Sequence, residues 1–225
     1  MMGMAGGVLF LGILASFVET AYIVPIYATV MIVSSGSRTV LFYKYINWRI
    51  VFRYTLGLLP GAFLGIFIFQ LLPKDMIKLA MGIFIMVMIF LPVSRKQSRF
   101  DLWIFLPVGL AAGFFGIFFG ASGPLTSPFY FRQGIIKEAM IGTKSICSLL
   151  EHTLKIFLFG LIGINVLDFG STLFFLVIAV VPGIYIGKML LNKISDRNFL
   201  IAFKVLLFFL AARIIILQLY KMISA

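Results

Sequence analysis

The sequence predicts an all-α fold, a polytopic bundle of transmembrane helices. Of its 225 residues, 62% are hydrophobic and only 12% are charged. A helix that spans a bilayer needs about 20 apolar residues. The charged residues lie in short islands between apolar runs of such length. Membrane spans therefore account for most of the chain, and a soluble domain fits nowhere in it.

We predict about seven to eight hydrophobic segments, because eight apolar runs follow one another and the first is short for a span. The runs are joined by short polar links. They are residues Met1–Phe17, Thr20–Tyr43, Trp48–Leu72, Met76–Val93, Leu102–Phe131, Ala139–Gly163, Phe169–Leu191 and Asn198–Tyr220.

The fifth segment, Leu102–Phe131, is longer than one span requires. Gly120-Ala-Ser-Gly-Pro124 interrupts it, and glycine and proline are the residues least favourable inside a helix. We therefore predict a broken helix at Gly120–Pro124. Two alternatives remain open, a segment that crosses the membrane completely and a re-entrant hairpin that turns back.

The two halves of the chain resemble each other, which predicts two internal repeats. The first repeat is residues 1–93, residues 94–101 form a basic loop, and the second repeat is residues 102–225. Residues 102–119 have no counterpart in the first repeat, so its opening helix is expected to be missing. The matching features are Pro60-Gly61 and Gly65 with Pro182-Gly183 and Gly187, Ile46-Asn47 with Ile164-Asn165, and Glu19 with Glu138.

Lys and Arg residues at the ends of the segments bear on orientation. If Leu102–Phe131 crosses fully, they fall about evenly on both sides of the membrane. If it turns back, most of the basic clusters share one face, which would be cytoplasmic. The loop around Asn47 is basic whereas the loop around Asn165 has only Asp168. This difference favours inverted repeats.

The break is the strongest candidate for a binding site. Its glycines let backbone N–H groups face a cavity, and a helix restarting near Pro124 aims the positive end of its dipole there. A small anion would fit such a site. The alternative is that the glycines serve only close helix packing. The predicted substrate-binding residues here are Gly120, Ser122, Gly123, Pro124 and Thr126.

Ionisable groups within spans form a second candidate, because such groups are costly in a membrane. Glu151 and Lys155 are four residues apart and meet on one helix face, where they can neutralise each other. His152 can titrate near neutral pH. We predict Glu151 to be structural. His152 and Lys155 are predicted either to contact the substrate or to make structural contacts.

Other polar and glycine positions complete the prediction. Arg38, preceded by serines, is predicted to line the substrate path, and Thr143 to cap a helix or contact substrate. Lys144 is most simply an interfacial anchor. The residues with a predicted structural role are Glu151, Pro60, Gly61, Gly65, Pro182, Gly183 and Gly187.

Several functions are disfavoured by what the sequence lacks. It has no HExxH, GxSxG or Walker pattern, so neither an enzyme nor a nucleotide site is indicated. One cysteine and one histidine cannot assemble a Cys/His zinc site, so we predict no metal and no cofactor. The Lys and Arg residues that give the net charge of +12 lie at the ends of apolar runs, where they suit contact with lipid headgroups better than with nucleic acid.

The sequence resembles the sulfite exporter TauE/SafE family over nearly its whole length. In the second half the resemblance rests on the motif from Gly113 to Pro124, with Pro128, Gly134, Glu138-Ala139 and Gly142-Thr143. In the first half it rests on Ser37-Arg38, Asn47-Trp48-Arg49, Pro60-Gly61 and Gly65. It implies export or uptake of a sulfur oxyanion or sulfonate, such as sulfite or sulfoacetate, across a prokaryotic inner membrane, with the glycine breaks flanking the substrate path.

We therefore predict a secondary transporter of a small anion, in the cell membrane, with homo-oligomers left open. The anion would bind near the midplane, and coupling would come from a proton or the membrane potential. A non-transporting assembly subunit is one alternative, since the opening helix is expected to be missing. An intramembrane enzyme is a weaker one, since neither nucleophile nor metal cluster is evident.

Overall fold

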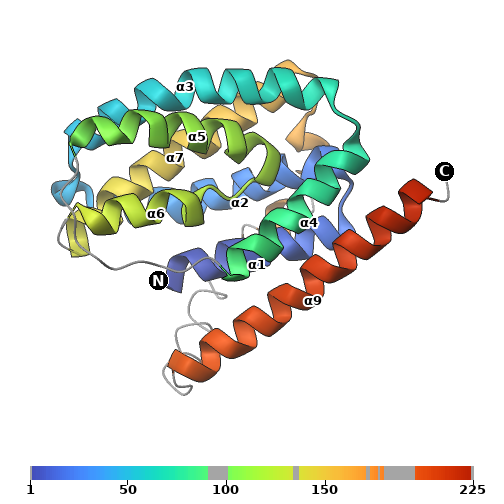
Figure 1. Ribbon diagram of the computed structural model, residues 1–225. Helices are drawn as coiled ribbons and strands as arrows, with labels where there is room; N and C mark the ends of the chain where they lie inside the picture. The colour runs from blue at the N-terminus through green and yellow to red at the C-terminus, as the bar shows by residue number, and fades with distance from the viewer. Residues whose placement is uncertain are drawn as a thin grey trace.

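The computed structural model describes residues 2–90, 101–133, 137–170, 173–176, 178–179 and 196–223, and these residues form helices and no strand (Figure 1). The predicted all-α class is confirmed. The α-helices are α1 (Met2–Phe17), α2 (Thr20–Leu41), α3 (Trp48–Leu71), α4 (Lys74–Phe90), α5 (Phe105–Phe119), α6 (Gly123–Arg132), α7 (Lys137–Leu161) and α9 (Asp196–Ile223). Short 3-10 helices are η1 (Tyr43–Tyr45), η2 (Leu102–Ile104) and η3 (Val166–Phe169).

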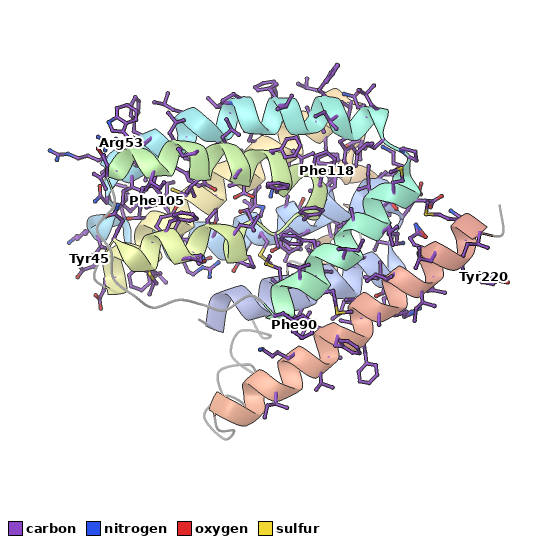
Figure 2. The ribbon with its side chains drawn as sticks, viewed as in Figure 1. Tyr45, Arg53, Phe90, Phe105, Phe118 and Tyr220 are labelled. Atoms are coloured by element: carbon purple, nitrogen blue, oxygen red, sulfur yellow. The ribbon has the colours of Figure 1, made fainter. Side chains whose placement is uncertain are left out.

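Four helices of the described residues are long and apolar enough to cross a membrane, namely Thr20–Leu41, Trp48–Leu71, Leu102–Phe119 and Lys204–Ile223. Large apolar side chains also point outward, as Figure 2 shows. They include Phe63 and Phe67 on α3 and Phe209 on α9, each at least half exposed. Such surfaces are unusual in soluble proteins and suit contact with lipid. The larger count of seven to eight segments and the internal repeat stay predictions.

The tightest helix pair is α3 with α5, which lie side by side in Figure 1. A Cβ atom added to Gly57 would overlap the carbonyl oxygen of Leu106, and one added to Gly61 would overlap that of Leu110. On the facing helix, Gly109 and Gly113 meet the α3 backbone in the same way. As the residue numbers rise along α3, the numbers of the α5 residues that they contact rise as well, so the two helices are parallel. Small residues permit this backbone approach, as in other membrane helix pairs.

The predicted break is confirmed. Helix α5 ends at Phe119, Gly120 adopts a φ of 70°, and α6 begins at Gly123. Left-handed backbone of this kind favours glycine. Figure 1 shows α6 returning alongside α5, so the chain forms a hairpin and does not continue in one direction. The positions Pro182, Gly183 and Gly187 lie outside the described residues.

Candidate functional site: a cationic cavity at the helix break

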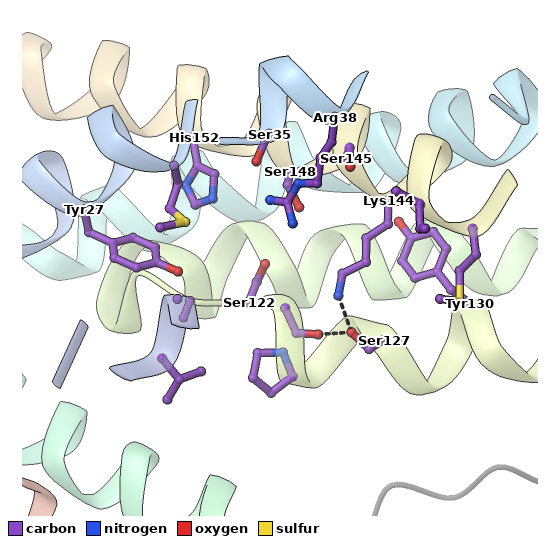
Figure 3. Close-up of a pocket in the computed structure, with 18 residues that line it drawn as sticks. Tyr27, Ser35, Arg38, Ser122, Ser127, Tyr130, Lys144, Ser145, Ser148 and His152 are labelled. Atoms are coloured by element: carbon purple, nitrogen blue, oxygen red, sulfur yellow. Dashed lines mark hydrogen bonds between the residues drawn. The ribbon is translucent and has the colours of Figure 1, made fainter. Parts of the chain in front are cut away.

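A cavity of about 150 Å³ lies where the hairpin break faces α2 and α7 (Figure 3). Its walls come from α1, α2, the break with the helix α6 that follows it, and α7. The lining residues are Gly7 and Val8 of α1; Tyr27, Met31, Ser35 and Arg38 of α2; Ala121 and Ser122 of the break; Gly123, Pro124, Ser127 and Tyr130 of α6; and Met140, Ile141, Lys144, Ser145, Ser148 and His152 of α7.

One wall of the cavity is the amino-terminal end of α6. The backbone N–H groups of Leu125 and Thr126 donate to the carbonyl oxygen of Ser122, so the helix starts directly after the break. Ser122, Gly123 and Pro124 all line the cavity. The positive end of the α6 dipole is therefore presented to the cavity, which favours a negatively charged occupant.

Two cationic side chains add to this field. Arg38 lines the cavity while its Nε and Nη2 atoms donate to the carbonyl and hydroxyl oxygens of Ser34, at 3.1 and 3.2 Å. Lys144 reaches in from α7, and its Nζ donates to Ser127 Oγ at 2.6 Å. Ser127 in turn donates to the carbonyl oxygen of Gly123, as the dashed lines in Figure 3 show. Among the described residues, the lining includes both cations and no carboxylate.

Hydroxyl groups and one imidazole supply the remaining polar surface. Serines line the cavity from α2, the break, α6 and α7. One buried atom of the lining residues, His152 Nδ1, has no hydrogen-bond partner among the residues that the structure describes. Buried polar atoms are usually satisfied, so unpaired ones at a cavity are places where a ligand or water would be bound.

Glu151 and Lys155 form a buried network behind the break. Their side chains are 2% and 1% exposed, and Lys155 Nζ lies 2.5 Å from Glu151 Oε1. Lys155 also donates to the carbonyl oxygen of Gly120 at 2.7 Å. Glu151 Oε2 accepts from Ser122 Oγ at 2.5 Å and from Tyr54 Oη at 3.1 Å. The network thus ties α7 and α3 to both sides of the break.

The structure separates the predicted site residues into two groups. Arg38, Ser122, Gly123, Pro124 and His152 line the cavity. The other four, Gly120, Thr126, Thr143 and Lys155, lie outside the lining. Lys155 donates to the carbonyl oxygen of Gly120, and Thr126 Oγ1 donates to that of Gly123. Thr143 Oγ1 accepts from the backbone N–H of Asn47 at 2.9 Å, next to the start of α3.

Lys144 is the cavity residue that sequence reasoning assigned elsewhere, as an interfacial anchor. A signal for it was present. Lys144, Ser148 and His152 are spaced at four residues and all line the cavity, so they form one face of α7. This spacing in the sequence could have predicted that Lys144 lies on the same face of α7 as His152.

Comparison with known proteins identifies the family of this chain. No curated protein and no solved structure matched the chain. A family model did match, the one described as sulfite exporter TauE/SafE, over residues 1–214. Because this match covers almost the whole chain, the protein belongs to the sulfite exporter TauE/SafE family.

Proposed function

We propose that this protein is a secondary transporter that binds a small sulfur oxyanion or sulfonate in the cavity at the helix break. The observation that carries the proposal is the cavity lining, which combines Arg38, Lys144 and the amino-terminal end of α6 and has no carboxylate in the described part of the chain. A small anion would neutralise the two cations and accept hydrogen bonds from the surrounding hydroxyls. The family description, a sulfite exporter, fits an occupant of this charge and size.

The residues divide into two roles under this proposal. Arg38 and Lys144 would contact the anion, together with Ser122 and the backbone at Gly123. Lys155 and Glu151 would act as positioning residues, since their network holds the Gly120 and Ser122 ends of the break. Alternating access would then move the elements around a site whose shape this network maintains.

Transport should depend on both cavity cations. In proteoliposomes containing labelled sulfite or sulfoacetate, Arg38→Gln and Lys144→Gln should each lower saturable flux roughly ten- to hundredfold, because a hydrogen bond to a charged group contributes about 1.5–3 kcal/mol. The matched control is Lys204→Gln, since Lys204 is exposed on α9. It should transport like the unchanged protein. Full flux in the two cavity variants would contradict the assignment, and no flux from the unchanged protein would favour a non-transporting subunit.

The hairpin also bears on orientation, and we propose that the end of the bundle carrying Lys44, Arg49 and Arg53 is cytoplasmic. Figure 2 shows Tyr45 and Arg53 at one end and Tyr220 at the other. The guanidinium of Arg53 lies 4.9 Å from the Trp103 ring, so the start of the hairpin is at the basic end.

Labelling of single cysteines with a membrane-impermeant maleimide tests this orientation. Lys221→Cys should react in intact cells, whereas Lys44→Cys should react only after the cells are permeabilised. The native Cys147 is buried and serves as an unreactive background. The reverse pattern would show that the basic end faces outward.

A further inference from the structure

His152 occupies a position in the cavity that the binding of an anion does not by itself require. Its side chain lies in the wall and is only 6% exposed, and its Nδ1 has no hydrogen-bond partner within the described ranges of the chain. The Tyr27 ring packs edge-on against the imidazole, with ring centroids 5.6 Å apart. Histidine is the side chain that changes charge most readily near neutral pH. The arrangement places a titratable group directly at the anion site.

Positively charged groups outnumber negatively charged ones around this imidazole. Arg38 and the Tyr27 phenol face it from α2. Lys144 and Lys155 belong to its own helix, α7, and the break contributes the neutral Ser122. The nearest carboxylate, Glu151, is already engaged by Lys155, Ser122 and Tyr54. An imidazolium in the empty cavity would therefore stand among cations, with Glu151 already committed to other donors.

An anion in the cavity changes this balance. Bound between Arg38 and Lys144, it would place a negative charge beside the imidazole and supply the missing counter-charge. By thermodynamic linkage, a proton on His152 must then strengthen anion binding by the same factor as the anion strengthens proton binding. We infer that His152 takes up a proton when the anion binds, so that anion and proton occupy the cavity together. This inference rests on the proposed function.

The ionisation state of His152 can be observed directly, because it is the one histidine of the chain. Protein labelled with ¹⁵N-histidine and held in nanodiscs would give a signal from this ring alone. Sulfoacetate is the suitable probe, since carboxyl groups ionise near pH 4 and its charge is constant between about pH 6 and about pH 8. At constant pH, adding sulfoacetate should convert the neutral imidazole spectrum to that of the imidazolium.

Binding affinity gives a second readout. In the unchanged protein the affinity for sulfoacetate should rise as the pH falls from about 8 to about 6, by at most about tenfold for each pH unit, as expected for one linked proton. His152→Gln should still bind sulfoacetate, with an affinity that depends less on pH than that of the unchanged protein, because Lys144 stays in the cavity. Ser148→Ala removes a neutral cavity group one turn away on α7 and should keep the pH dependence.

The outcomes separate the two proposals. If sulfoacetate binds while the imidazole spectrum stays unchanged, or if His152→Gln keeps the full pH dependence of the unchanged protein, the proton inference is overturned and the transporter proposal stands. If neither sulfoacetate nor sulfite binds the unchanged protein, the proposed anion site fails and the inference fails with it. The spectrum of the unchanged protein decides the question even if His152→Gln does not fold.

Discussion

Replacing Gly61 by alanine should destabilise the protein by about 3 kcal/mol or more, although the change adds a single methyl group. The new Cβ would overlap the carbonyl oxygen of Leu110 on the adjacent helix α5. That atom belongs to the backbone, so the overlap can be relieved only by moving α3 and α5 apart. Overpacking of well-packed interiors typically costs 1–3 kcal/mol, and here the contacts along the whole helix pair are disturbed. Unfolding by SDS in detergent micelles would measure the loss.

Gly160→Ala is the matched control for this prediction. Gly160 lies near the end of α7, and a Cβ atom there would meet nothing within 4 Å. The substitution should be neutral or stabilise the protein by up to about 1 kcal/mol, because alanine favours a helix more than glycine does. If both variants changed stability equally, the close approach of α3 to α5 would not be what requires glycine at position 61.

Lys155→Met should cost about 3–5 kcal/mol of stability and abolish transport. It removes the counter-charge of Glu151 and the donor to the Gly120 carbonyl oxygen. Breaking a buried ion pair on one side leaves an uncompensated charge, which is the costly case. The hairpin end would lose its tie to α7, so flux of sulfite or sulfoacetate should fall together with stability in the same micelle and proteoliposome assays.

Two comparisons test the cause of this loss. Lys221→Met breaks the Lys221–Asp75 pair, in which the lysine is 64% exposed, and should cost less than about 1 kcal/mol. The double variant Glu151→Gln with Lys155→Met removes both buried charges and should recover part of the lost stability. A double variant less stable than Lys155→Met alone would show that the charge of Glu151 is not the source of the penalty.

The all-α membrane fold was predictable from composition. With 62% hydrophobic residues and charges confined to short links, few alternatives can bury or solvate such a chain. The break at Gly120–Pro124 was predictable as well, because glycine and proline act on the backbone of their own segment. The proposal of an anionic ligand rests on the same local features, the glycines of the break and the helix that restarts after it.

The tertiary structure alone decided how these features meet. Periodicity places Glu151 and Lys155 on one helix face. It does not reveal that this face meets Tyr54 and Ser122, which are 97 and 29 residues away in sequence from Glu151. The network therefore lies behind the break, and Lys144 rather than Lys155 reaches the cavity.

The sequence also could not predict the direction of the chain after the break. The residues of the break interrupt a helix but are compatible with a crossing segment and with a hairpin. Packing of α6 against α5 and α7 selects the hairpin. The backbone preferences of a few neighbouring residues thus determined where the helix ends. Contacts between distant segments determined where the next helix goes and which cations face the anion site.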